Sequence, residues 1–135
     1  MRPAQIYHLT EQAALSECIS AGEYSPASLP EDGFVHCSAG RDTTLAVAND
    51  YFSSADGPVV LLEIEVSRLS SDVVYEAAAP IEGGEASHLA TAVEFPHVYG
   101  PIDTEAIRAA GILGKTAGGF EWPQTFDTLD AITGD

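Results

Sequence analysis

Three histidines, His8, His36 and His97, each lie inside a short segment flanked by Tyr, Ser or Gly. Imidazole has an unperturbed pKa near neutrality, so these side chains can transfer protons, hydrogen-bond a substrate or bind a metal. One histidine on a strand more often hydrogen-bonds a neighbouring carbonyl than performs chemistry. Three in similar surroundings favour a shared site, and all three are therefore our candidate catalytic residues.

All three histidines fall in predicted strands, and His8 and His36 lie in the first two. Residues 5–9 alternate short polar and apolar side chains and stop at Thr10, which is typical of a short strand. Residues 34–38 are bounded by Gly33 and Gly40 and predict a second short strand. Because side chains alternate across a strand, His36 shares a face with Ser38 while Cys37 takes the other. His36 and Cys37 are therefore not expected to form a base and nucleophile pair.

Two helices are predicted between the strands of the first half. Thr10 is a good N-cap for a helix that stops at Gly22, where glycine favours termination. The segment 23–33 is rich in Ser, Pro, Glu and Asp and predicts a loop. Asp42 or Thr43 can cap a second helix.

The segment 58–66 is the clearest strand in the sequence, with apolar residues on one face and Glu63 and Glu65 on the other. Residues 73–75 predict another strand. Residues 95–102, which contain His97, predict either an edge-type strand or a strand followed by a turn, because two prolines interrupt them.

A third helix is predicted after residues 95–102. Asp103 or Thr104 is predicted to cap a short helix through Ala110.

Residues 78–92, which include His88, predict a flexible excursion because glycines lie at their centre.

The charge excludes several classes of function. The chain has 135 residues, with 21 acidic and 5 basic side chains, for a formal net charge of −16. Nucleic-acid binding requires clustered Lys and Arg, and the five bases form no stripe, so we expect no nucleic-acid partner. No apolar stretch is long enough to span a bilayer and no signal-peptide core is evident, so we expect a cytoplasmic protein without a membrane partner.

The length and the order of elements predict one α+β domain over residues 1–135. We expect its core to cover about residues 4–117, followed by an acidic, aromatic C-terminal tail over 118–135. The sequence leaves open whether this tail packs back over the domain or frays.

The three histidine blocks, together with residues 22–24 and 46–49, resemble the bacterial family named domain of unknown function 952. The resemblance covers roughly residues 4–108 and consists of several ordered blocks. That family is grouped with proteins of the ADP-ribosyltransferase fold. The resemblance therefore implies a split, mostly antiparallel β-sheet with flanking helices, and a cleft that holds NAD in active relatives.

The resemblance also implies roles for residues of the three blocks. His8 matches a first-strand residue that hydrogen-bonds the ribose of the cofactor, His36 lies on the neighbouring strand, and His97 comes from a later core strand. The residues implied to contact the cofactor accompany these histidines: Tyr7, Thr10, Ser38, Arg41, Tyr99 and Gly100.

The implied reaction is NAD-dependent ADP-ribosyl transfer or a related NAD-consuming reaction. Cleavage of the bond between nicotinamide and ribose develops an oxocarbenium-like cation, which a carboxylate stabilises. Most active relatives use a Glu on a late strand, but here no acid lies within 95–102, and Glu94 and Glu105 flank that segment.

Two other functions remain open. One is a non-catalytic domain that binds a nucleotide or another small ligand in the same cleft. The other is a metal site formed by His8, His36 and His97, the ligand set of a catalytic zinc. Because the cysteines and histidines lack metal-type spacing, no metal is expected.

Overall fold

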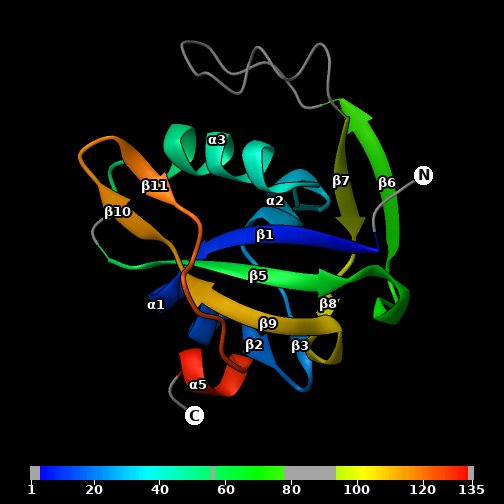
Figure 1. The fold of residues 1–135 in the computed structure, drawn as a ribbon. Helices are drawn as coiled ribbons and strands as arrows, with labels where there is room; N and C mark the ends of the chain where they lie inside the picture. The colour runs from blue at the N-terminus through cyan, green and yellow to red at the C-terminus, as the bar shows by residue number, and fades with distance from the viewer. Residues whose placement is uncertain (1–3, 56, 78–93, 134–135) are drawn as a thin grey trace.

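The computed structural model describes residues 4–55, 57–77 and 94–133, and it has the α+β architecture expected from the sequence (Figure 1). Every strand pair among the described residues is antiparallel. The excursion predicted over 78–92, with His88, lies outside the described residues.

The first sheet has the strand order β1–β5–β9, with β1 at Gln5–Glu11, β5 at Val59–Glu65 and β9 at Ile107–Ile112. β5 confirms the strand predicted over 58–66. Its alternate side chains enter two apolar clusters: Val60 and Leu62 lie in one, and Val59 and Leu61 lie in the other. The sheet is therefore covered on both faces.

The second sheet has the order β4–β7–β6, with β4 at Val35–His36, β7 at Glu94–Tyr99 and β6 at Asp72–Ala77. Of the two alternatives predicted for residues 95–102, the strand followed by a turn is confirmed, since β7 ends at Tyr99 and a bend at Gly100 follows. The edge strand is wrong, because β7 is the central strand. Pro96 is tolerated there because its carbonyl accepts a hydrogen bond from the Cys37 N–H at 3.1 Å, beyond the end of the short β4. Proline has no N–H to donate on this side, and the β4–β7 ladder ends at this point, so no ladder hydrogen bond inside β4 is lost.

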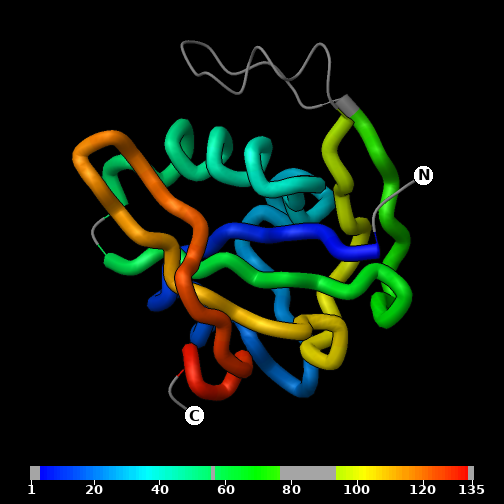
Figure 2. The backbone as a smooth tube through the Cα atoms, viewed as in Figure 1, coloured from blue at the N-terminus to red at the C-terminus, as the bar shows by residue number. Residues whose placement is uncertain are grey.

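The two sheets are joined at one backbone bridge. The N–H of Tyr7 donates to the carbonyl of Ser38 at 2.8 Å, and the N–H of Ser38 donates to the carbonyl of Tyr7 at 2.7 Å. No other pair joins β1 to the strand β4 in the described chain. Figure 2 traces the backbone through both groups of strands.

Smaller elements complete the fold. A third sheet has the order β2–β3–β8, and a hairpin pairs β10 with β11. Two 3₁₀ turns, η1 and η2, precede β6 and β9. Their bounds are β2 Ile19–Ser20, β3 Glu23–Tyr24, β8 Ile102–Asp103, β10 Gly114–Thr116, β11 Gly119–Glu121, η1 Val66–Arg68 and η2 Thr104–Ala106.

The helices are α1 Gln12–Glu17, α2 Ser28–Asp32, α3 Arg41–Tyr51 and α5 Leu129–Thr133. Thr10 does not cap α1, because β1 continues to Glu11, which occupies the N-cap position. The segment 23–33 is not wholly loop, since it contains β3 and α2. The second predicted helix is confirmed as α3, whose N-cap is Gly40.

The helix expected after Asp103 is also a correction. A single 3₁₀ turn, η2, leads into β9, so that Ala110 lies in a strand and pairs with Leu62 of β5. Burial decides this outcome: Ile107 and Ala110 are both buried against the first core cluster. Tertiary packing of a sheet edge therefore overrides a helical spacing that the sequence also permits.

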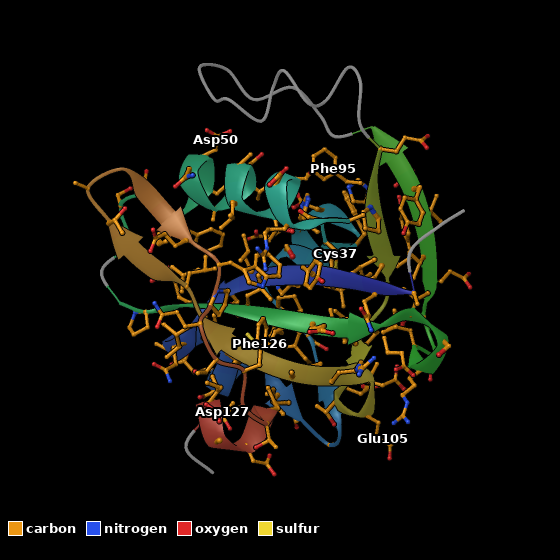
Figure 3. The ribbon with its side chains drawn as sticks, viewed as in Figure 1. Cys37, Asp50, Phe95, Glu105, Phe126 and Asp127 are labelled. Carbon is orange, nitrogen blue, oxygen red and sulfur yellow. The ribbon has the colours of Figure 1, made fainter. Side chains whose placement is uncertain are left out.

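The C-terminal segment packs back over the domain. Phe120 and Ile132 are buried, and the Phe120 N–H donates to Asn49 Oδ1 on α3 at 2.9 Å. Ala110 and Asp127 form a backbone bridge between β9 and the segment before α5. Phe126 lies in front of the first sheet in Figure 3 and packs against its second apolar cluster.

No helix among the described residues is long and apolar enough to cross a membrane.

Candidate functional site

A cavity of about 340 Å³ lies where the two sheets separate. Residues 7–9 of β1 and residues 36–38 beside β4 form its sheet side, together with His97 of β7. Helix α3 covers it with Val47 and Tyr51, and Phe52 at the C-cap of this helix lines it too. The cavity therefore exists because β1 and β4 stop pairing after the Tyr7–Ser38 bridge.

All three predicted catalytic histidines line this cavity, but their surroundings differ. His8 and His97 are buried, with exposures of 6% and 4%, whereas 54% of the His36 side chain is exposed. His36 and His97 are cross-strand partners in the β4–β7 ladder. Their side chains share one face for that reason, with ring centroids 5.6 Å apart.

Both ring nitrogens of His8 are used by the protein itself. Nδ1 lies 2.6 Å from the carbonyl oxygen of His36, and Nε2 lies 2.8 Å from the hydroxyl of Tyr24. A carbonyl can only accept, so Nδ1 carries the proton and Nε2 accepts from the Tyr24 hydroxyl. Burial raises the pKa of Tyr24, which keeps that hydroxyl protonated as a donor.

His8 is consequently a neutral side chain. Burial lowers its pKa from 6.5 to about 4, because the charged imidazolium loses solvation inside the protein. With both nitrogens occupied and no charge, His8 has no free hydrogen-bonding group for a ribose.

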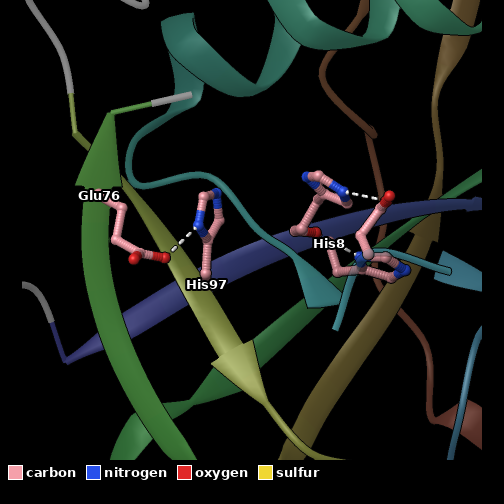
Figure 4. Close-up of polar contacts among 5 residues, drawn as sticks. His8, Glu76 and His97 are labelled. Atoms are coloured by element: carbon pink, nitrogen blue, oxygen red, sulfur yellow. Dashed lines mark hydrogen bonds and ion pairs between the residues drawn. The ribbon is translucent and has the colours of Figure 1, made fainter. Parts of the chain in front are cut away.

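His97 has a different arrangement. Its Nδ1 lies 2.8 Å from Oε1 of Glu76 (Figure 4). The same oxygen accepts a hydrogen bond from the Tyr99 hydroxyl at 2.6 Å. These two donors lower the pKa of the Glu76 carboxyl, with the Tyr99 bond the larger cause. A carboxylate held in this way fixes Nδ1 as the protonated nitrogen and leaves Nε2 as the basic one.

No described residue is hydrogen-bonded to Nε2 of His97. Since His97 lines the cavity while Glu76 does not, the part of the ring beyond the carboxylate bond is the part that meets the cavity. An oriented imidazole with an unprotonated nitrogen can accept a proton from a ligand or from water.

Aromatic rings fix the position of His97 and His36. Phe34 stacks on His97 with ring centroids 4.0 Å apart at 18°, and it meets His36 edge-on at 4.6 Å. His36 Nε2 lies 2.8 Å from Oδ2 of Asp32, at the end of α2. Each of these two imidazoles is therefore held between a carboxylate and a ring.

The backbone of Leu9 also faces the cavity. At the two ends of the β1–β5 ladder, the Gln12 N–H donates to the Pro58 carbonyl and the Val66 N–H donates to the Ala4 carbonyl. Because hydrogen-bonding directions alternate along a strand, the N–H and carbonyl groups of the even-numbered residues between them also face β5. The N–H and carbonyl of Leu9 therefore face away from β5. β1 forms no pair with β4 beyond Tyr7, and Leu9 lines the cavity, so this peptide edge is left facing it.

The structure divides the predicted cofactor contacts into two groups. Tyr7 and Ser38 line the cavity beside the backbone bridge. The others are not among its described lining residues. Thr10 is buried in β1, Tyr99 bonds Glu76, Gly100 lies close to Ser71, and Arg41 lies 4.8 Å above the ring of Trp122.

The cavity has little positive charge. No lysine or arginine is among the described residues that line it, whereas the carboxylate of Asp32 is. Arg41 acts on one lining residue: burial and the charge of Glu63 raise the pKa of Tyr7, and the charge of Arg41 lowers it by a smaller amount. The described cavity is therefore suited to neutral or cationic ligands more than to free anions.

The described residues contain no group of three or more His, Cys, Asp or Glu side chains placed to hold a metal ion. His8 cannot join His36 and His97 as a ligand without giving up the bonds to the His36 carbonyl and Tyr24. Cys37 lines the cavity, but burial raises the pKa of its thiol and disfavours the thiolate.

Several residues of the site have no clear signal in the sequence. Glu76 contacts His97 because β6 pairs with β7. The two residues are 21 positions apart in the sequence, and no helix or strand periodicity predicts a contact at that separation. Asp32 and His36 are four residues apart, a separation that suggests contact within a helix, but here helix α2 ends at Asp32. The Leu9 peptide becomes evident once the strand register is known.

Comparisons with known proteins give a family and similar solved structures, and neither carries a named activity. A family model described as "Protein of unknown function (DUF952)" matches residues 9–110. The crystal structure of protein CC0527 from Caulobacter crescentus is similar, with a TM-score of 0.66 and 26% identity, over 95% of this chain and 97% of that chain. The solution NMR structure of CC0527 gives 0.64 and 28%, over 90% and 93%. No curated protein matches the chain.

Proposed function

The chain belongs to the DUF952 family of proteins of unknown function, and on that premise we propose that it binds a small planar compound with an amide edge in the cavity between the two sheets. The single observation that carries this proposal is the Leu9 peptide edge, which faces the cavity without a strand to pair with. A peptide N–H beside a carbonyl is complementary to a carboxamide or a lactam, which offers one acceptor and one donor.

Size and charge support a ligand no larger than a nucleoside. Ligand cavities range from about 300 to 1,000 Å³, and the volume of about 340 Å³ lies at the small end of that range. Aromatic side chains from α3 and Phe95 of β7 supply apolar contact, and the described lining offers no cation for a phosphate. A neutral or positively charged ring fits these properties.

His97 supplies the means of proton transfer at this site. Its Nδ1 is held by Glu76, and its Nε2 has no described partner, so it can accept a proton from a bound ligand or water. His36, held by Asp32 at 2.8 Å, is the second titratable group of the same face.

Nicotinamide and nicotinic acid test the binding proposal as a matched pair. Nicotinamide carries a carboxamide, whereas nicotinic acid has a carboxylate with no N–H donor and a negative charge. We expect nicotinamide, titrated in NMR experiments, to shift the Leu9 amide resonance and nicotinic acid to leave it unchanged. Equal responses to both compounds, or none to nicotinamide and none to a panel of lactam rings, would contradict the proposal.

A second candidate is NAD-dependent ADP-ribosyl transfer or a related NAD-consuming reaction. Glu76 favours it, because it brings a carboxylate next to the late strand β7, where the sequence offers no acid. The separation of β1–β5–β9 from β4–β7–β6 supports the split sheet of the ADP-ribosyltransferase fold. Arg41 and backbone amides would carry the phosphate contacts, with modest affinity.

Calorimetric titration with NAD and with ADP-ribose tests this second candidate. No binding of either at millimolar concentration would exclude it. If NAD binds, nicotinamide release separates an enzyme from a binding domain, and Glu76→Gln should abolish release while NAD binding persists. Release that survives this substitution would place the chemistry elsewhere.

A further inference from the structure

The point where β1 and β4 separate has an unusual hydrogen bond. Tyr7 and Ser38 bond each other in both directions, so in an antiparallel ladder the next bonded pair would be Leu9 with His36, two residues further along each strand. The Cys37 N–H donates to the Pro96 carbonyl, so the peptide groups of Cys37 face β7. Because these directions alternate along a strand, the carbonyl of the neighbouring His36 faces the other way, toward β1. Yet this carbonyl accepts its bond from the His8 ring at 2.6 Å.

The His8 ring therefore takes the place that a backbone N–H would have in a continuous sheet. We propose that His8 is a positioning residue whose imidazole holds the His36 carbonyl away from the Leu9 N–H, keeping the sheets apart and the Leu9 peptide edge open to the cavity. The role differs from a ligand contact, because both ring nitrogens are bonded within the protein. Its use in ligand binding rests on the proposed function, whereas the positioning does not.

Tyr24 makes the arrangement specific to one tautomer. Its hydroxyl, buried in the first apolar cluster, lies 2.8 Å from Nε2 of His8. With the Tyr24 hydroxyl as donor, Nε2 must accept, and the proton of the neutral ring is left on Nδ1, which faces the His36 carbonyl. The chain from Tyr24 through His8 to His36 thus has one direction of donation throughout.

The other described groups at this chain agree with the assignment. The Thr10 side chain also hydrogen-bonds the Tyr24 hydroxyl and lowers the pKa of Tyr24 against the larger effect of burial, and a hydroxyl that accepts from Thr10 can still donate to His8. The charge of the His36 imidazole lowers the pKa of His8, in addition to the larger effect of burial. A neutral spacer suits the position, because a second charge beside His36 would be unfavourable. The same ring therefore separates the strands without adding charge to the cavity.

Amide hydrogen exchange of the whole chain tests the proposal directly. In the unaltered protein, Leu9 should exchange faster than Tyr7, which bonds Ser38, and faster than His8 and Thr10, which face β5. In His8→Ala the freed carbonyl can pair with Leu9, so exchange at Leu9 should slow about tenfold relative to Thr10. His8→Gln is the matched control, because it keeps a side-chain N–H donor and should leave Leu9 exchanging rapidly.

Three results would overturn the proposal: slow exchange at Leu9 in the unaltered protein, an unchanged Leu9 rate in folded His8→Ala, or ¹⁵N spectra with the His8 proton on Nε2. If His8→Ala does not fold, the pattern in the unaltered protein and in His8→Gln still decides the matter. Nicotinamide titration distinguishes the proposed ligand binding from the positioning role of His8. Failure of nicotinamide and the lactam panel to bind an open Leu9 edge would count against the proposed function, while the positioning role would stand.

Discussion

His8 and His97 are both buried, both lie on strands at the same cavity and both bond a side chain with an ionisable group, but they differ in what is left over. On the β1 side, the protein uses both nitrogens of His8. On the β7 side, Glu76 holds one nitrogen of His97, and no described residue bonds the other. The comparison teaches that burial and position do not separate a structural histidine from a functional one, whereas a count of its bonded atoms does.

The largest expected effect is on stability at the β1 side. His8→Leu removes the donor of the His36 carbonyl and the acceptor of the Tyr24 hydroxyl, and the leucine side chain fills the space through which Leu9 could reach that carbonyl, at about 1–3 kcal/mol for each lost bond. We therefore expect a loss of about 2–6 kcal/mol in the free energy of unfolding, measured by urea denaturation. A loss below 1 kcal/mol would mean that these bonds are replaced by water.

The next effect is a pH dependence that separates the two histidines. Between pH 6.5 and about 4, the unfolded chain protonates His8 while the folded protein does not, so stability falls as the pH falls through this window. The shift corresponds to about 3 kcal/mol in total. Denaturation at pH 7 and pH 4 measures it, and His8→Gln is the control, because it should lack this part of the dependence and keep that of the carboxylates.

At the β7 side the pattern should reverse. His97→Gln removes the imidazole but keeps a side chain that can bond Glu76 near the surface, so we expect a loss of about 1 kcal/mol or less in stability. Binding of nicotinamide should weaken about tenfold, because the cavity loses one polar contact. Calorimetry and denaturation on the same samples test both, and a stability loss as large as that of His8→Leu would end the distinction.

The smallest effect concerns the support of Glu76. Tyr99→Phe removes the stronger of the two hydrogen bonds that lower the pKa of this carboxyl, so its pKa should rise toward the ordinary value. Because Tyr99 and Glu76 are both accessible to solvent, we expect little change in stability. Carboxyl carbon titration by NMR measures the change, and an unaltered pKa would show that His97 alone holds Glu76.

Periodicity predicted those elements whose burial pattern is simple. β5 follows from the alternation over 58–66, and the second predicted helix is present as α3. The predicted cap of α3 was wrong, because Gly40 is the N-cap and Asp42 and Thr43 lie inside the helix. The prediction failed at β9, where Ile107 and Ala110 have helical spacing but pair with β5 as a strand. It also failed at Thr10, a good capping residue that continues the strand instead. Local preference is weak wherever a segment can bury the same residues in either conformation.

The cavity shows the same limit. The three histidines could be selected from residue type alone, and all three line it. The carboxylates that orient two of them, Glu76 and Asp32, come from separate elements and carry no sequence signal that marks them. The site residues Thr10, Arg41, Tyr99 and Gly100, implied by resemblance, do not line the described cavity, because neighbours along the chain diverge when strands turn or end.

The sequence by itself determined the fold class, the charge of −16 and the set of imidazoles available for chemistry. These properties follow from composition and from spacings of a few residues, which local physics can interpret. The tertiary structure decided that the ring nitrogens of His8 bond groups of the protein, while one ring nitrogen of His97 has no bonding partner among the described residues. It also left the Leu9 peptide without a strand partner. Such outcomes depend on strand register, since a peptide or a ring nitrogen is free only when no distant segment arrives to bond it.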